Sequence, residues 1–254
     1  MTKVIKKVKD FIKLRDGNLF LNKSVGFVPT MGALHEGHIA LIKKSLKQND
    51  ITVVSIYINP TQFDNPDDLK KYPNTFNQDL QILKKLKVDY LFHPNYSQIY
   101  PDNYNYRIIE TDFSKKLCGK FRPGHFEGVL TIVMKLLNIV KPDKAYFGEK
   151  DYQQLQLVKG MVKAFFINTK IISHPTVRTK EGLALSSRNL RLNEEQLKVA
   201  AEFPRLLKSG LSIKKIKSQL KKLGFEVEYI EKFGDRIFGA VYLENIRLID
   251  NVKV

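Results

Sequence analysis

Two histidines separated by two residues, His35 and His38, are the first side chains in the sequence whose types and spacing indicate chemistry. Residues three apart on a helix lie on the same face. A helix N-terminus also carries unpaired N–H groups and a partial positive charge, so it attracts anions. Two imidazoles at that place can donate hydrogen bonds to phosphate oxygens, and Gly37 between them lets a ligand approach the backbone. The motif favours nucleotide binding over its alternative, two solvent-facing histidines on an ordinary helix.

The residues on either side of the histidines predict the elements that hold them. Residues 25–28 form a short apolar run that is typical of a buried parallel strand. Residues 29–32, Pro-Thr-Met-Gly, then turn the chain, and from His35 to Leu46 apolar residues recur at helical spacing. The histidines are therefore predicted at the start of a helix that follows a buried strand.

Apolar strands alternate with helical patterns along the first part of the chain, which predicts βαβ units and a parallel sheet. The further predicted strands are 51–58, 89–93, 106–110, 145–147 and 170–173, and the further predicted helices are 77–87, 125–140 and 152–166. Residues 64–73 are polar and contain prolines, so they predict a long loop. This pattern indicates an α/β domain.

A smaller α+β unit is predicted at the end of the chain. Asn193 is a good N-cap for a helix that Pro204 should end or kink. Ser212 begins a lysine-rich helix that Gly224 stops. The three strands predicted after that helix are 225–230, 240–243 and 246–249. We therefore divide the chain into a larger domain, 1–178, and a small C-terminal lid domain, 179–254.

Length and composition exclude several classes of protein. A chain of 254 residues can bury one large core, or a core and a small second domain. The one cysteine, Cys118, excludes a disulfide framework and fits a reducing compartment, so we expect a cytoplasmic protein. The sequence has neither the apolar core of a signal peptide nor a segment of the ~18–20 apolar residues that cross a bilayer, so no membrane partner is expected.

The formal net charge of +17 leaves nucleic acid open as a partner. The lysines, however, occur in pairs along the whole chain, on the polar faces of predicted helices, and no basic stretch is interleaved with aromatic residues. A basic RNA-binding module is therefore the second hypothesis. The favoured hypothesis is a protein with an anionic small substrate and no nucleic-acid partner.

Five motifs fall at the predicted carboxyl ends of strands or in loops that can reach them, which is where open α/β sheets hold their ligands. They are PTMGALHEGH (29–38), NPTQF (59–63), LCGKFRPGHFEGV (117–129), FGEKDYQQ (147–154) and LALSSRN (183–189). The first and the last resemble the HIGH and KMSKS elements of the class I nucleotidyl-transferase superfamily. With all five in this order, the chain resembles the pantoate–β-alanine ligase family from about residue 25 to residue 190. A weaker similarity to the family lies in RLIDN (247–251).

The resemblance implies a Rossmann-like first domain and a ligation in two steps. The carboxylate of pantoate attacks the α-phosphorus of Mg-ATP and releases pyrophosphate. The amine of β-alanine then attacks the pantoyl adenylate and releases AMP. The resemblance further implies Mg²⁺ as the cofactor and a homodimer as the assembly.

The resemblance also assigns residues. His38 is carried over as the proton donor, and His35 and Lys150 complete the catalytic group. The residues expected to bind ATP are Met31, Gly32, Ala33, Leu34, His35, Glu36, Gly37, His38, Gly148, Glu149, Lys150, Asp151, Val177, Leu185, Ser186, Ser187 and Arg188. Those expected to bind pantoate are Gln62, which also meets β-alanine, and Gln154, with Pro29, Met31 and Phe63 packing on the methyl groups and Arg122 and His125 assisting. Asp79 is the candidate Mg²⁺ ligand.

The sequence departs from the superfamily pattern at the late motif. Ala184 and Ser187 stand where KMSKS has its lysines, so binding of ATP should depend on Lys150 and Arg188, which argues against a tRNA synthetase. The region after Asn193 looks short for the family. The nearest alternative function is another adenylyl- or cytidylyltransferase, in which a phosphate is the nucleophile. NPTQF and GEKDYQQ favour pantoate.

Overall fold

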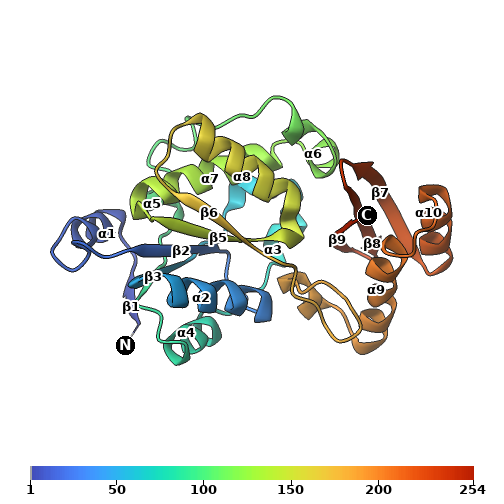
Figure 1. Cartoon of the computed structure of the whole chain (residues 1–254), viewed down its shortest axis with the longest axis horizontal. Helices are drawn as coiled ribbons and strands as arrows, with labels where there is room; N and C mark the ends of the chain where they lie inside the picture. Colours follow the sequence, from blue (N-terminus) through green and yellow to red (C-terminus); the bar gives the residue numbers. More distant parts are fainter. Residues whose placement is uncertain (1) are drawn as a thin grey trace.

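Six parallel strands form the sheet that organises the larger part of the molecule (Figure 1). The structure is a computed structural model and describes residues 2–254. The strands are β1 (Lys3–Ile5), β2 (Val25–Thr30), β3 (Ile51–Ile56), β4 (Tyr90–Phe92), β5 (Lys144–Gly148) and β6 (Lys170–His174), in the spatial order β1-β4-β3-β2-β5-β6. Every neighbouring pair in this sheet is parallel. The α/β, Rossmann-like prediction is confirmed.

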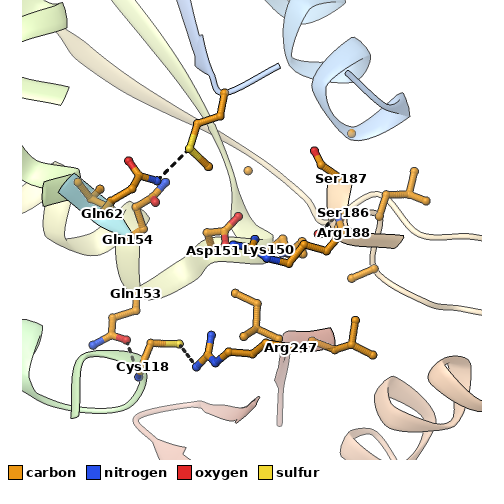
Figure 2. A pocket seen from close by; sticks show the side chains of 18 of the residues that line it. Gln62, Cys118, Lys150, Asp151, Gln153, Gln154, Ser186, Ser187, Arg188 and Arg247 are labelled. Carbon is orange, nitrogen blue, oxygen red and sulfur yellow. Dashed lines mark hydrogen bonds and ion pairs between the residues drawn. The ribbon is translucent and has the colours of Figure 1, made fainter. Parts of the chain in front are cut away.

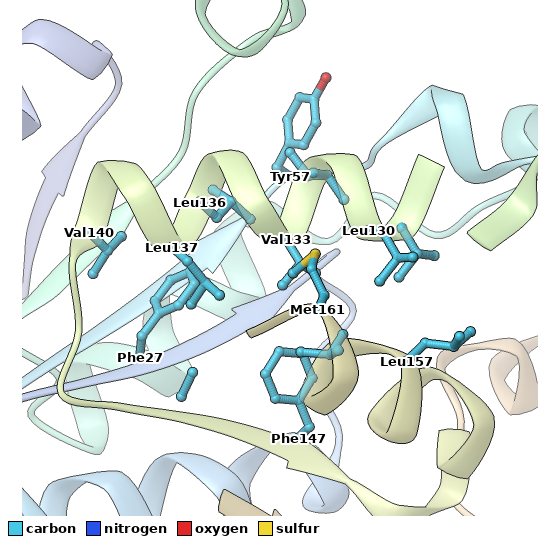
Figure 3. Close-up of a cluster of buried hydrophobic side chains, with 14 of the residues drawn as sticks. Phe27, Tyr57, Leu130, Val133, Leu136, Leu137, Val140, Phe147, Leu157 and Met161 are labelled. Atoms are coloured by element: carbon cyan, nitrogen blue, oxygen red, sulfur yellow. The ribbon is translucent and has the colours of Figure 1, made fainter. Parts of the chain in front are cut away.

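Helices cover both faces of this sheet, as Figure 1 shows. On one face lie α2 (Glu36–Gln48) and α4 (Phe76–Lys85), and on the other lie α1 (Val8–Arg15), α7 (His125–Val140) and α8 (Tyr152–Ala164). The apolar face of α7 carries six side chains that the periodicity assigned to the core, and all six are buried: Val129, Leu130, Val133, Leu136, Leu137 and Val140. They pack with Phe27 of β2 and Phe147 of β5 (Figure 3). The sheet is thereby held rigid between two apolar layers.

The order of the strands creates a topological switch point beside β2. From β2 the chain proceeds through β3 and β4 in one direction, whereas β5 and β6 lie on the other side of β2. The carboxyl ends of β2 and β5 therefore lie next to one another, where such sheets leave a crevice for ligands. The histidine motif follows β2 and the GEKD motif follows β5, so the fold brings both motifs to that crevice.

A three-stranded antiparallel sheet makes up the C-terminal part, in the order β7-β8-β9. Its elements are α9 (Glu194–Leu207), α10 (Ile213–Lys222), β7 (Phe225–Phe233), β8 (Arg236–Leu243) and β9 (Ile246–Lys253). Asn193 and Ser212 cap the two helices as predicted. This part has an apolar cluster of its own, while Tyr229 and Phe238 join the larger cluster. The division at residues 178 and 179 stays a prediction.

Two local predictions are wrong. Residues 106–110 form no strand, because the N–H of Ile108 donates to Thr131 Oγ1 of α7 and the segment runs along that helix. The loop at 64–73 contains a helix, α3 (Pro66–Lys70), which Asn65 caps. Pro204, which was expected to end or kink α9, does not end it, because the helix continues to Leu207.

Two further short helices, α5 (Tyr96–Ile99) and α6 (Cys118–Phe121), had not been predicted. Each spans four residues, which is too short for a helical period to be visible in the sequence. Within residues 2–254, no helix is both long enough and apolar enough to cross a membrane.

Candidate active site

A cavity of about 420 Å³ lies at the carboxyl ends of β2 and β5 and is closed on one side by the C-terminal sheet. All five motifs contribute side chains to its wall, together with residues of β8 and β9. Its volume lies in the range of small-molecule sites in proteins. Figure 2 shows Gln62 and Gln154 at one end of the cavity and Ser186, Ser187 and Arg188 at the other, with Lys150 between them.

His35 and His38 cap the helix whose N-terminus they occupy. The Nδ1 atom of His35 accepts the N–H of Gly37 at 3.1 Å, and the Nδ1 atom of His38 accepts the N–H of His35 at 3.4 Å. The two rings lie 4.1 Å apart between centroids. Because each Nδ1 acts as an acceptor, the ring proton of a neutral imidazole must reside on Nε2. Both histidines can therefore offer an Nε2–H donor to a ligand in the cavity.

Electrostatics hold both imidazoles neutral. Burial, followed by the positive charge of Lys150, lowers the pKa of His35 to about 4. Burial, followed by the neighbouring His35 and Lys150, lowers the pKa of His38 well below its usual value. A neutral imidazole has no readily transferable proton at neutral pH, although it donates a hydrogen bond. This differs from the role of proton donor that the family resemblance implied for His38.

Gly37 is required by the cap of α2. A Cβ atom on Gly37 would lie 2.8 Å from Cε1 and 2.9 Å from Nδ1 of His35, closer than real Cβ contacts come. The space above Gly37 is thus filled by the ring that accepts its N–H. Gly37 also lines the cavity, so the interpretation that it lets a ligand approach the backbone stays a prediction.

Asp79 holds the loop between β2 and α2 and is not arranged as a metal ligand. Its carboxylate is 2% exposed and accepts the N–H groups of Ala33 at 2.9 Å and Leu34 at 2.8 Å. Thr75 Oγ1 donates a third hydrogen bond at 3.1 Å. Both oxygens are therefore occupied, and Asp79 does not line the cavity. The prediction of Asp79 as a Mg²⁺ ligand is wrong, because its buried charge stabilises backbone amides that had been expected to face a phosphate.

Lys150 enters the cavity from a tight turn at the end of β5. The turn is the 3₁₀ helix Glu149–Asp151, which runs directly into α8. The Lys150 side chain is 18% exposed, and its Nζ lies 3.6 Å from the carboxylate of Asp151. Among residues 2–254, Asp151 is the only carboxylate within ion-pair distance of this Nζ. Lys150 therefore presents a positive charge that a single, partly exposed carboxylate offsets.

The serine-rich motif is tied to the histidine loop from the opposite side. Ser187 Oγ donates to the carbonyl oxygen of Ala33 at 3.0 Å, which joins the last motif to the first. Arg188 donates from Nη2 to Asp68 of α3 at 2.5 Å and lies over the ring of Tyr72. Burial opposes ionisation of Asp68, but the hydrogen bond and charge of Arg188 hold its pKa below the usual value. Asp68 of α3 is therefore the counter-charge of Arg188.

A chain of side chains fixes the amide of Gln62. Gln62 Oε1 accepts from Asn59 Nδ2 at 3.1 Å, so Nε2 is left facing Met31 Sδ at 3.2 Å. Tyr100 donates to Asn59 Oδ1 at 2.8 Å, which sets the orientation of that amide in turn. His125 Nδ1 donates to the main-chain oxygen of Gln62 at 2.7 Å. Gln62 thus presents an N–H donor to the cavity, suited to a carboxylate or hydroxyl oxygen.

The predicted site residues divide into two groups. Those that line the cavity are Met31, His35, Gly37, His38, Gln62, Gly148, Lys150, Asp151, Gln154, Val177, Leu185, Ser186, Ser187 and Arg188, with Pro29, Phe63, Arg122 and His125. Those that do not line it are Gly32, Ala33, Leu34, Glu36, Asp79 and Glu149. The N–H of Gly32 donates to Thr30 Oγ1, and those of Ala33 and Leu34 donate to Asp79 of α4. The Glu149 carboxylate lies 3.6 Å from Arg236. All five motifs therefore reach one cavity, but fewer of their residues line it than the sequence predicted. That the lining residues bind a ligand stays a prediction.

Sequence reasoning missed three residues that shape the site. Asn59 orients Gln62. Its position in the NPTQF motif was a signal by which it could have been found. Asp68 binds Arg188 from a segment interpreted as loop, and nothing in the sequence indicates the pairing. Gln153, next to Gln154, is 5% exposed and bonds the backbone at Cys118, Phe113 and Lys116. Gln153 thus fixes the neighbouring LCGKF loop.

Comparisons with known proteins agree with these motifs. The family model described as Pantoate-beta-alanine ligase matches residues 2–253. A pantothenate synthetase of Bdellovibrio bacteriovorus is 48% identical over 254 residues, covering all of both chains, and one of Legionella pneumophila is 51% identical over 98% of both. The region after Asn193 is therefore not short relative to the Bdellovibrio protein, contrary to expectation.

Two solved structures share the whole fold. The Francisella tularensis pantoate-beta-alanine ligase, complexed with beta-gamma ATP and beta-alanine, superposes with a TM-score of 0.94 at 47% identity, covering 100% of this chain and 98% of that one. A pantothenate synthetase of Thermus thermophilus superposes with a TM-score of 0.87 at 34% identity, covering 100% and 99%.

Proposed function

The chain belongs to the pantoate–β-alanine ligase family, and from this premise we propose that it joins pantoate to β-alanine with consumption of ATP, through a pantoyl adenylate. The observation that carries the proposal is the convergence of five motifs on one cavity. A cationic lysine, two imidazole donors and two glutamine amides meet there. This set matches a triphosphate next to a small hydroxy acid.

In the first step, a carboxylate oxygen of pantoate forms a bond to the α-phosphorus while the bond from that phosphorus to the pyrophosphate oxygen breaks. A carboxylate is already a nucleophile, so the protein must position the reactants and offset charge rather than supply a base. We assign the amides of Gln62 and Gln154 to pantoate and Lys150 to the phosphates. Ser186 and Ser187 would contact the triphosphate from the far side, and Arg188 would exchange Asp68 for a phosphate.

For His35 and His38 we propose hydrogen-bond donation to phosphate oxygens instead of proton transfer. The support is that each ring uses Nδ1 to cap the helix, and that burial and Lys150 keep both rings neutral. Donors fixed in this way need no reorganisation as charge moves onto the leaving pyrophosphate. The capping interaction is thus the means by which the protein aims two N–H groups into the cavity.

Magnesium, in this proposal, arrives with ATP as part of the co-substrate. Within residues 2–254, no group of three or more His, Cys, Asp or Glu side chains is arranged to hold a metal ion. Mg²⁺ is commonly bound by substrate phosphates with one or two carboxylates. Asp151 lines the cavity beside Lys150 with 45% of its side chain exposed, which makes it the carboxylate we assign to this ion. The ion would neutralise phosphate charge.

In the second step, the amine of β-alanine forms a bond to the acyl carbon of the adenylate and the bond to AMP breaks. The attacking amine loses a proton in the same step. We propose that Gln62 meets β-alanine as well as pantoate, because its fixed amide is at the cavity end where Gln154 also lies (Figure 2). No pyrophosphate departs in this step, so the phosphate-binding groups matter less to it than to the first.

The proposal is tested by pyrophosphate release without β-alanine. Enzyme, Mg-ATP and pantoate should release at most about one equivalent of pyrophosphate in a burst, because the adenylate stays bound. Omission of pantoate, or removal of Mg²⁺ with a chelator, should abolish the burst. Steady pyrophosphate release with a mononucleotide in place of pantoate would reject the ligase and favour a nucleotidyltransferase that attacks with a phosphate.

We further propose a cytoplasmic homodimer without a nucleic-acid partner. The family resemblance supports the dimer, and the single, buried Cys118 fits a reducing compartment. Scattered lysines should give only weak binding of RNA that is lost as salt rises. Light scattering at physiological salt should report the mass of two chains, unchanged by added RNA. A monomer mass, or a stable RNA complex, would contradict this assignment, as would recovery of the protein outside the cytoplasm in cell fractionation.

A further inference from the structure

The last residue of the RLIDN motif contacts the turn that carries Lys150. Asn251 lies in β9 of the small sheet and is 4% exposed. Its Nδ2 donates to the main-chain oxygens of Glu149 and Lys150, at 2.9 Å in each case. A side chain of the C-terminal part is therefore bound to the backbone of the GEKD turn in the larger part.

The orientation of the Asn251 amide is determined by its partners. Arg236 donates from Nη1 to Asn251 Oδ1 at 2.7 Å. An arginine can only donate and a main-chain carbonyl can only accept, so the oxygen must face Arg236 and the nitrogen must face the turn. The amide oxygen then accepts from Arg236, and the amide nitrogen donates to two main-chain oxygens. Aspartate has the same shape but would set an anionic oxygen against two carbonyl oxygens.

Arg236 contacts the first residue of the same turn and the residue that follows the turn. Its guanidinium lies 4.0 Å from the ring centroid of Tyr152, the first residue of α8, and its Nη2 lies 3.6 Å from the Glu149 carboxylate. Asn251 and Arg236 therefore hold the three-residue turn and the start of α8 together. Lys150 is in the middle of that turn, and the direction of its long side chain depends on where the turn holds its Cα atom.

We propose that Asn251 is a positioning residue for Lys150, acting through the two hydrogen bonds to the turn. The proposal rests on the phosphate-binding role proposed for Lys150. A displacement of about 1 Å in a positioned group can cost roughly 10²-fold in rate. Since the hydrogen bonds of Asn251 to the turn go to its backbone, and its remaining side-chain partner, Arg236, contacts the same turn, loss of Asn251 should affect the step that uses Lys150 and spare the step that does not.

The test uses Asn251→Asp and Asn251→Ala in single turnovers of the two half-reactions. Adenylation should fall by up to roughly 10²-fold in Asn251→Asp, while amide formation from supplied pantoyl adenylate should fall much less. In a Lys150→Ala background, Asn251→Asp should add little further loss, because two residues that act as a unit are not additive. Asn251→Ala adds no new charge and carries the test if the aspartate variant fails to fold.

A matched exchange in the same sheet serves as the control. Asp235 is exposed at the turn between β7 and β8, so Asp235→Asn should leave both half-reactions unchanged. Equal losses in both half-reactions, or a double variant that shows the full product of the two single losses, would mean that Asn251 is merely structural. Normal adenylation in Lys150→Ala alone would instead reject the role of Lys150, and with it the premise.

Discussion

Lys150→Ala should lose roughly 10²- to 10³-fold in the rate of adenylation, the effect of removing one preorganised group that stabilises transition-state charge, about 2.7–4 kcal/mol. The physical reason is the position of its Nζ: Lys150 lines the cavity with 18% of its side chain exposed, and one partly exposed carboxylate at 3.6 Å is its only partner among the described residues. That carboxylate cannot replace a cation when charge develops on pyrophosphate. Single-turnover measurements with Mg-ATP and pantoate determine the loss in the adenylation rate.

The comparison of half-reactions makes this prediction specific. Amide formation from supplied pantoyl adenylate involves no departing pyrophosphate, so Lys150→Ala should slow it less. The unfolding free energy should change by less than about 1 kcal/mol, because the only ion pair lost is a solvated one. Lys159→Ala, an exposed lysine on α8 outside the cavity, is the matched control and should behave as wild type. If Lys150→Ala slows both half-reactions equally, Lys150 does not act as a phosphate clamp.

The architecture could be predicted wherever the pattern is local and long. The apolar run before the histidine motif predicted a strand buried on both faces, and the helical spacing of apolar residues over the sixteen residues of α7 predicted a helix with one buried face. β1 and β4 have only three residues each, and they are strands because β1 pairs with β4 and β4 also pairs with β3. β4 lay within the predicted strand 89–93, whereas no strand was predicted over β1. Short elements are decided by tertiary contacts, which no local pattern contains.

The site divides in the same way. The motifs located His38, Lys150 and Gln62, because chemistry constrains those residue types and their neighbours. The partners of these residues are distant in sequence and could not be inferred: Asp79 binds amides forty-five and forty-six positions away, and Asn251 reaches the Lys150 turn across a hundred and one. A carboxylate or amide looks the same in the sequence whether it binds a ligand or a backbone group. Only the fold decides between those roles.

His38 is expected to act as a neutral hydrogen-bond donor, and two substitutions distinguish this from proton transfer. His38→Ala should lower adenylation by roughly 10²- to 10³-fold, whereas His38→Gln should retain a substantial part of the rate, because a glutamine amide can donate from the position of Nε2. A glutamine cannot transfer a proton, so equal losses in both variants would favour the proton donor. Either variant also loses the long hydrogen bond to the His35 N–H, a cap of roughly 1 kcal/mol.

The pH dependence gives an independent measure of the same proposal. The ratio of kcat/KM for wild type to that for His38→Gln reports the ionisation of His38 in the free enzyme, because the substrates and the groups common to both enzymes ionise equally in both experiments. Since the pKa of His35 is about 4 and that of His38 is lowered well below its usual value of 6.5, both rings stay neutral as pH falls from 8 to 6. The ratio should therefore be flat over that interval. A ratio with an inflection near pH 6.5 would show that a histidine titrates there, and the neutral-donor role would have to be abandoned.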